Sequence, residues 1–272
     1  MSTGKLMEQN PTQSYDPDYF QPLAFAEERH FWFKSRNQLI RTFLISVREN
    51  FTKTDRILEA GCGTGNVLRT ITRVFPPESV VGMDLYHQGL VYAKNRVSCP
   101  LLQADMHYPP FGTQFGLVGL FDVMEHLEDD NLVLRDLNRM ISDQGYLILT
   151  VPAFTSLWSY FDIAGHHIRR YQKTDLNRKL ELAGFQVIKL SYFMSILFPV
   201  VWLRRKITKK HLAINQNQGQ IFQSTVEELQ IIPVLNGVLS LILGWENQLI
   251  RIGFRIPFGT SLIAVAKKKN SI

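Results

Sequence analysis

The chain has 272 residues, of which 45% are hydrophobic and 20% charged, a composition typical of a folded globular protein and not of a disordered one. Its two cysteines, Cys62 and Cys99, are too few for a disulfide framework or a four-cysteine zinc site. The net charge of +6 is local, because six basic residues and no acidic residue lie between Glu181 and Glu227. The charge therefore does not indicate a nucleic-acid-binding protein.

The first residues of the chain and the length of its apolar runs indicate the cellular compartment. Residues 1–20 are polar and do not resemble a signal peptide. Since no uninterrupted apolar run reaches the roughly 18 residues of a membrane span, we expect no transmembrane helix. The expected location is the cytoplasm.

Strand-like and helix-like patterns alternate along most of the chain. Residues 38–47 have apolar positions at helical spacing. Short apolar runs predict strands at residues 56–60, 79–83, 100–103, 115–120, 145–151, 185–192 and 261–266. Helices are predicted between them at residues 66–74, 89–96, 132–141 and 174–183. This alternation predicts an α/β protein with a doubly wound, mostly parallel seven-stranded sheet.

The chain divides into four predicted parts. Residues 1–50 form an irregular lead-in and a helix, and residues 51–195 form the α/β core. About sixty residues separate the sixth and seventh strands, too many for a structureless loop in a compact domain. Apolar helical patterns at residues 195–203 and 226–252 instead predict a helical insertion over residues 196–258, which we interpret as a lid. Residues 259–272 form the last strand and a basic tail.

A glycine-rich loop follows the first predicted strand. The segment from Arg56 to Gly65 reads RILEAGCGTG, with Glu59 ahead of three glycines spaced two residues apart. Glycines allow a sharp turn and a close approach of the backbone to a ligand, and the following helix start presents N–H groups to a polar cofactor. The nicotinamide fingerprint is not met, because Asn66 stands where its last glycine is required.

This loop and the strand ends after it resemble the class I S-adenosylmethionine-dependent methyltransferases, which have a Rossmann-like sheet. The second strand ends at Asp84 (VVGMD) and the third leads to Asp105 and Met106. The resemblance implies that Asp84 binds the ribose hydroxyls, Asp105 accepts from the adenine amine and Met106 packs on that ring. S-Adenosylmethionine is then the cofactor and S-adenosylhomocysteine the product. The implied cofactor-binding residues are Glu59, Gly61, Cys62, Gly63, Gly65, Asp84, Leu85, Asp105 and Met106.

Further motifs are similar to those of a subgroup often associated with polysaccharide and glycolipid genes. They include HFWFKSR at residues 30–36, FDVMEHLED at 121–129, the segment from Asp162 to Tyr171 and IPFGTSL at 256–262. The resemblance covers residues 27–268. It departs from the subgroup at His166, where glycine is usual, so either His166 or His167 faces the site.

Candidates for the chemistry follow the fourth and fifth strands, where ligands bind in open α/β sheets. A base is required only if the acceptor is a hydroxyl, an ammonium or an acidic carbon. The predicted catalytic residues are Asp122, His126, His167 and Tyr171, and the predicted acceptor-binding residues are Trp158, Asp162, His166, Arg169 and Arg170. The alternatives are structural: His126 as a helix cap and the arginines in surface ion pairs. No metal is expected, because adjacent histidines point apart and the sequence places no third ligand beside His166 and His167.

These motifs predict methyl transfer to a small-molecule or lipid- or glycan-linked acceptor. The alternative is a catalytically silent protein that uses the fold as a binding or membrane-surface module. Nucleic acid is not an expected substrate, since the fourth strand ends in Phe121-Asp122 and lacks the Asn-Pro-Pro-Tyr-like motif of amino-methylating enzymes.

A membrane surface is a possible partner. The apolar residues 196–203 precede a basic cluster at residues 204–210, with Arg204, Arg205, Lys206, Lys209 and Lys210. This pattern suits peripheral contact with an anionic membrane, and the alternative is packing on the core or on a second subunit. The sequence leaves the oligomeric state open.

Overall fold

A seven-stranded sheet forms the centre of the computed structural model, which describes residues 20–52, 54–112, 115–212 (side chains to 206) and 231–269. The strands are β1 (Arg56–Ala60), β2 (Val80–Asp84), β3 (Leu101–Gln103), β4 (Phe115–Phe121), β5 (Ile141–Pro152), β6 (Phe185–Phe193) and β7 (Ser261–Lys268). Their order across the sheet is β3-β2-β1-β4-β5-β7-β6. The sheet is parallel from β3 to β5, and β7 runs antiparallel to both of its neighbours. The predicted fold class is confirmed.

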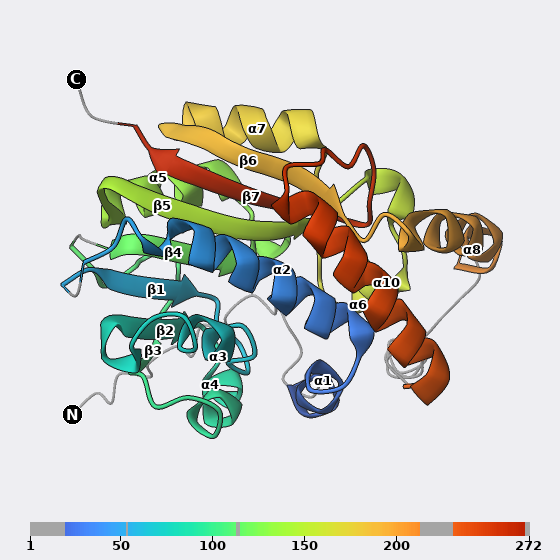
Figure 1. The fold of residues 1–272 in the computed structure, drawn as a ribbon, viewed down its shortest axis with the longest axis horizontal. Coiled ribbons are helices and arrows are strands. Elements are labelled where there is room, and N and C mark those ends of the chain that lie inside the picture. The colour runs from blue at the N-terminus through green and yellow to red at the C-terminus, as the bar shows by residue number, and fades with distance from the viewer. Residues whose placement is uncertain (1–19, 53, 113–114, 213–230, 270–272) are drawn as a thin grey trace, which may run out of the picture.

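Helices cover the sheet (Figure 1). They are α1 (Phe20–Glu27), α2 (Phe31–Arg48), α3 (Leu68–Ile71), α4 (His87–Lys94), α5 (Asp130–Met140), α6 (Tyr160–Ala164), α7 (Lys173–Leu182), α8 (Leu197–Leu212) and α10 (Pro233–Arg251). Short 3₁₀ turns are η2 (Pro77–Ser79), η3 (Met124–His126) and η4 (Thr155–Leu157). All seven residues of β4 are buried, as expected for a central strand packed on both faces.

Two helices that the patterns did not predict lie near the sheet's carboxyl edge. Helix α1 begins at Phe20, inside the segment expected to be irregular, and α6 follows β5. Helix α2 begins at Phe31, well before the predicted start at residue 38, because His30 caps it by accepting a hydrogen bond from the Trp32 backbone N–H at 3.3 Å. Helix α3 is shorter than predicted, since only Leu68–Ile71 is helical.

The predicted insertion is helical where the structure describes it. Helix α10 packs beside α2, and Asn236 joins them by accepting from the Phe31 N–H at 2.7 Å. Pro233 does not interrupt this helix but occupies its first turn, where its missing N–H has no cost. Residues 226–230 of the expected second helix lie outside the described residues. Among the described residues, none of the helices combines the length and the apolar character that crossing a membrane requires.

Candidate functional site

A cavity of about 1640 Å³ lies at the carboxyl ends of the parallel strands. Its floor is the glycine loop and the ends of β2 and β4, and its walls come from α1, the start of α2 and the loop before α7. Leu197 and Val201 of α8 and Leu235 and Leu239 of α10 complete the lining. The insertion therefore borders the cavity, as expected of a lid, although its division as a separate domain stays a prediction.

Gly63 and Gly65 of the loop each require glycine, but for different physical reasons. Gly63 has a φ of +50°, and a Cβ built on it would meet no atom within 4 Å, so the backbone there faces open space. Gly65 has a φ of +78°, and its Cβ would lie 2.9 Å from the Cα and Cβ of Ala93. Gly63 thus leaves room for a ligand, whereas Gly65 lets α4 pack against the loop.

Glu59 supplies a buried carboxylate to the same end of the cavity. It is 2% exposed, and its Oε2 has no hydrogen-bond partner among the described residues. Burial is the main cause that raises the pKa of Glu59 well above its ordinary value, while the Arg36 charge acts in the opposite direction. A cationic ligand group would compensate this carboxylate, and the amino group of S-adenosylmethionine has that charge.

Asp84 fixes the loop from the end of β2. Its carboxylate accepts from the Gly63 N–H at 2.6 Å and from the Tyr86 N–H at 2.8 Å. Burial raises the pKa of Asp84, although the backbone N–H groups of Tyr86, Gly63 and Leu85 act to lower it. A carboxylate has about four lone pairs, so Asp84 can still accept from a ligand hydroxyl.

The other predicted cofactor residues also line the cavity. Cys62, Leu85, Asp105 and Met106 all contribute to its wall. Asp105 accepts from the backbone N–H of His107 at 2.8 Å, and the Nδ1 of that histidine lies 2.9 Å away. These residues therefore line one cavity, and their assignment to the parts of S-adenosylmethionine stays a prediction.

Helix α1 closes the cofactor side through a network that sequence reasoning missed. The Glu27 carboxylate accepts from the Thr64 hydroxyl and from Arg96, each at 2.5 Å. Arg96 also donates to the Ala24 carbonyl at 2.8 Å. Residues 27 and 96 are far apart in the chain, and neither belongs to a motif, so no sequence signal connects them.

Asp122 is held by an arginine from the segment before the core. Its φ is +55°, and Arg36 donates to its Oδ2 at 2.6 Å. The Arg36 guanidinium also lies over the Trp32 ring at 4.9 Å. Arg36 of the HFWFKSR motif thus holds Asp122 at the cavity wall. The sequence alone did not indicate this ion pair.

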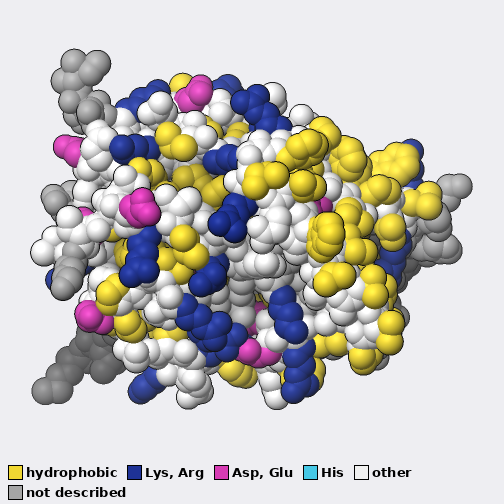
Figure 2. Space-filling model, in the orientation of Figure 1, with side chains coloured by type: hydrophobic (Ala, Val, Ile, Leu, Met, Phe, Trp, Pro, Cys, Tyr) yellow, Lys and Arg dark blue, Asp and Glu magenta, His cyan; other side chains and the backbone are white. Residues whose placement is uncertain are grey.

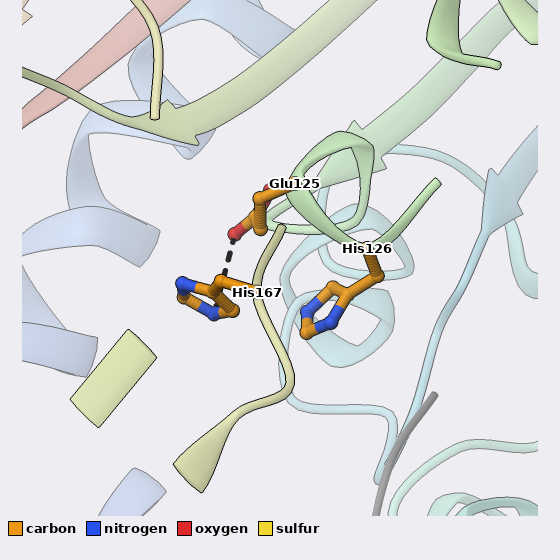
Figure 3. A group of neighbouring side chains, drawn as sticks. All are labelled: Glu125, His126 and His167. Atoms are coloured by element: carbon orange, nitrogen blue, oxygen red, sulfur yellow. Dashed lines mark ion pairs between the residues drawn. The ribbon is translucent and has the colours of Figure 1, made fainter. Parts of the chain in front are cut away.

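Glu125, His126 and His167 form a compact group, here called the Glu-His-His cluster (Figure 3). All three line the cavity. The Oε1 of Glu125 lies 4.0 Å from the Nε2 of His167, and the two imidazole rings are 4.8 Å apart at 85°. Burial is the main cause that raises the pKa of Glu125 well above its ordinary value, and the charge of Asp122 is the next cause. Burial is also the main cause that lowers the pKa of His126 to about 3, and the charge of His167 is the next cause.

Asp162 lies behind this cluster and does not line the cavity. It is fully buried and accepts from the Nε of Arg170 at 2.6 Å and from its Nη2 at 3.1 Å. Its Oδ1 is also 3.0 Å from the Nδ1 of His167. Burial acts to raise the pKa of Asp162, but hydrogen bonds from His167 and the Arg170 charge outweigh it, and the pKa lies well below its ordinary value. The carboxylate therefore orients His167 and Arg170.

The two adjacent histidines both line the cavity, but they lie differently. His167 belongs to the Glu-His-His cluster, whereas His166 lies beside it in the left-handed region at a φ of +52°. That backbone conformation favours glycine, which accounts for the residue usual at this position in the subgroup. His166, Trp158 and Arg170 line the cavity as predicted.

Tyr171 and Arg169 do not line the cavity, so the expectation that they contact a substrate is not met in this structure. Tyr171 is 1% exposed, and its hydroxyl donates to Asp130 Oδ2 at 2.8 Å and to the Met124 carbonyl at 3.0 Å. Arg169 pairs with the same Asp130 carboxylate at 3.0 Å. Both residues tie their loop to the start of α5.

Comparison with known proteins identifies the family. The family model described as "Methyltransferase domain" matches residues 25–190, more than half of the chain. A malonyl-[acyl-carrier protein] O-methyltransferase of Legionella pneumophila is 36% identical over 100 residues, covering 35% of this chain and 35% of that protein. A mitochondrial ubiquinone biosynthesis O-methyltransferase of Candida albicans is 28% identical over 123 residues, covering 42% of this chain and 38% of that protein.

Solved structures agree with this family. The plantazolicin methyltransferase BpumL, solved in complex with SAH, superposes with a TM-score of 0.59 at 14% identity, covering 95% of this chain and 93% of that one. The chain therefore belongs to the methyltransferase-domain family, and it has the fold of class I S-adenosylmethionine-dependent methyltransferases. The predicted family and fold are confirmed, whereas the activity, the cofactor and the glycan-associated subgroup stay predictions. The chain spans well under half the length of the two curated relatives.

Proposed function

We propose that this protein transfers the methyl group of S-adenosylmethionine to an oxygen of a small-molecule or lipid- or glycan-linked acceptor. One observation supports this most strongly: a single cavity joins the glycine loop and the buried Glu59 to the Glu-His-His cluster. One end thus suits a cationic, ribose-containing cofactor, and the other end suits an acceptor that gives up a proton. The names of the two curated relatives, both O-methyltransferases, support an oxygen acceptor.

The chain's own residues would position the acceptor. The bound cofactor supplies an electrophilic methyl group, so the protein has mainly to orient the acceptor, exclude water and receive its proton. Because Asp162 is ionised and can only accept, the Nδ1 of His167 donates to it. The Nε2 of His167, which lines the cavity, is then the ring nitrogen that remains to receive the acceptor's proton. Asp122, locked by Arg36, limits the space between cofactor and acceptor.

The insertion favours an amphiphilic acceptor. Apolar side chains from α8 and α10 line the cavity beside Arg204 and Arg205. Such a wall suits an apolar chain next to an anionic group. The glycan component rests on the motif resemblance alone.

We also propose that the protein is cytoplasmic and contacts a membrane surface through α8 and α10. Large apolar side chains gather over these helices (Figure 2), among them Val234, Leu241 and Trp245, which are 80%, 67% and 73% exposed. Lys206 lies 3.9 Å over the Trp202 ring, which places a cation beside an interfacial aromatic residue. This surface would bring a lipid-linked acceptor to the cavity.

Calorimetry with S-adenosylmethionine tests the cofactor part of the proposal. Asp84→Ala should weaken binding by roughly 1.5–3 kcal/mol, about 10- to 150-fold, because it removes charged hydrogen bonds. Asp143→Ala, at an exposed carboxylate outside the cavity lining, is the control and should bind normally. Equal affinity in both folded variants would contradict the assignment of Asp84. Methyl transfer to a panel of hydroxyl acceptors with and without lipid chains then tests the acceptor class.

A further inference from the structure

We propose that Glu125, His126 and His167 bind a divalent first-row transition-metal ion on the acceptor side of the cavity. The ligand atoms of these three residues all lie within 4.8 Å of one another. Two imidazoles and one carboxylate form the ligand set of many catalytic zinc sites and suit other first-row ions. Ca²⁺ and Mg²⁺ are disfavoured, because they prefer sites made of oxygen alone.

The ligand atoms lie close to the spacing that one ion requires. Bonds from zinc to imidazole nitrogen and carboxylate oxygen are about 2.0–2.2 Å each, so two ligand atoms of a tetrahedral ion lie about 3.3–3.6 Å apart. Glu125 Oε1 and His167 Nε2 are 4.0 Å apart, too far for a hydrogen bond between them. No two ligand atoms of the cluster lie more than 4.8 Å apart, so inward movements of about 0.5–1.5 Å by these side chains would complete the coordination.

The buried carboxylate of the cluster would be stabilised by a cation. Glu125 is 1% exposed, and its Oε2 has no hydrogen-bond partner among the described residues, while its Oε1 faces His167. Leaving a carboxylate oxygen buried without a partner is costly. Arg170 lies nearby, but its guanidinium is engaged with Asp162 and the Ala153 carbonyl. A metal ion would satisfy the lone pairs of Glu125 and of His167 together.

The residues behind the cluster support a ligand role for His167. Ligating histidines usually donate their second ring N–H to a carboxylate, which fixes the tautomer and the ring orientation. His167 has this arrangement, since Asp162 holds its Nδ1 at 3.0 Å. Asp162 is in turn fixed by two hydrogen bonds from Arg170. The lone pair of Nε2 is thereby directed toward Glu125.

An ion here would have an open position toward the cavity. Three protein ligands leave at least one site for water or substrate. If the proposed methyl transfer holds, an acceptor oxygen would occupy that site, and the ion would lower the pKa of its hydroxyl. The proton would then leave to solvent, because the Nε2 of His167 binds the ion in this case and does not act as the base. This role rests on the proposed function, whereas the metal site itself does not.

The test is metal binding by protein first stripped with a chelator. We expect calorimetry with Zn²⁺ to show one equivalent bound, and Co²⁺ to give the visible absorption of a site with nitrogen ligands. Glu125→Gln and His167→Ala should each weaken Zn²⁺ binding by about 10- to 100-fold or more. His87→Ala is the matched control, because His87 is exposed at the start of α4 and lies outside the cavity lining, and it should bind Zn²⁺ like the unmodified protein.

S-Adenosylhomocysteine calorimetry on every variant shows that the fold and the cofactor end are intact, and separates this proposal from the proposed function. The metal site is overturned if the unmodified protein binds no Zn²⁺, or if His87→Ala weakens binding as much as His167→Ala. It is also overturned if Glu125→Gln and His167→Ala both retain full Zn²⁺ affinity. Zn²⁺ binding without methyl transfer to any acceptor would leave the metal site standing and count against the proposed function alone.

Discussion

At Gly63 the backbone turns into open space, and the size of a side chain there decides whether a cofactor fits. Alanine at a φ of +50° has a strain on the order of 1 kcal/mol, and the β-branched valine has more. We therefore expect both Gly63→Ala and Gly63→Val to lose stability in thermal unfolding, valine the more. Valine should additionally abolish S-adenosylhomocysteine binding, because its methyl groups occupy the cofactor's space. Full affinity in a folded Gly63→Val protein would refute this assignment.

The residues best predicted from the sequence are those that a motif places at a strand end. Glu59, Asp84 and Asp105 lie at the cavity because their strands are parallel and end at one edge. Residues that act through a distant partner could not be predicted. Arg36 meets Asp122, and Glu125 meets His167, only after the chain has folded. From the sequence no metal was predicted, because only the adjacent pair His166 and His167 was considered. The structure instead brings Glu125 and His126 close to His167.

Asp130 connects three elements at the scale of helices and loops. Its fully buried carboxylate accepts from Lys179 of α7 at 2.9 Å and from Tyr171 at 2.8 Å, and it pairs with Arg169. Burial acts to raise its pKa, but these hydrogen bonds and charges outweigh it and lower the pKa. Because the folded-state pKa lies below the unfolded one, this carboxylate stabilises the fold above a pH of about 4, and the stabilisation is lost as the pH falls further.

Asp130→Asn tests this connection. We expect it to lower the free energy of unfolding at neutral pH by about 3 kcal/mol, because it leaves the partly buried Lys179 and Arg169 without their anion. The loss should shrink as the pH is lowered below about 4, since protonation removes the charge from the unmodified protein as well. Urea unfolding across this pH range measures both effects. A pH-independent difference would show that the charge of Asp130 is not the cause.

Helix α10 is joined to α2 by a buried amide. Asn247 donates to the Ser35 carbonyl at 2.9 Å and to its hydroxyl at 3.2 Å. We expect Asn247→Leu to destabilise the fold by about 1–3 kcal/mol, the usual effect of losing buried hydrogen bonds. The neighbouring Gln248 is exposed, so Gln248→Leu should change stability by less than about 0.5 kcal/mol. Urea unfolding of both variants provides the measurement, and equal effects would contradict a specific role for Asn247.

Helices and strands were predictable where a local apolar pattern marks them, and less predictable where tertiary contacts determine them. The seven strands appear close to their predicted ranges because each is a short apolar run between turn residues. Helix α1 has weak amphipathic patterning, and its position depends on the buried pair of Glu27 and Arg96. Helix α6 has only five residues and depends on the capping box of Ser159 and Asp162. Such helices follow from contacts that a local pattern does not contain.

At the scale of the whole molecule, the described basic side chains of α8 fall into two groups, one in the cavity lining and one on the surface. Arg204 and Arg205 line the cavity, while Lys206 is exposed beside Trp202. Neutralising all these residues would therefore alter the acceptor site together with the surface. A test of membrane contact is cleaner on α10, whose exposed apolar residues Val234, Leu241 and Trp245 share one helical face.

We expect the unmodified protein to co-sediment with anionic liposomes at low salt and to be released by high salt. Apolar area contributes roughly 25 cal/mol per Å² on burial, and each nearby cation adds about 1 kcal/mol at an anionic surface. The triple variant Val234→Ser, Leu241→Ser and Trp245→Ser should stay in the supernatant while binding S-adenosylhomocysteine normally. Leu182→Ser is the control, because Leu182 is 71% exposed on α7, away from this face. If the unmodified protein does not sediment, or the triple variant sediments as well as the control, the apolar face of α10 serves another purpose, such as contact with a second copy of the chain.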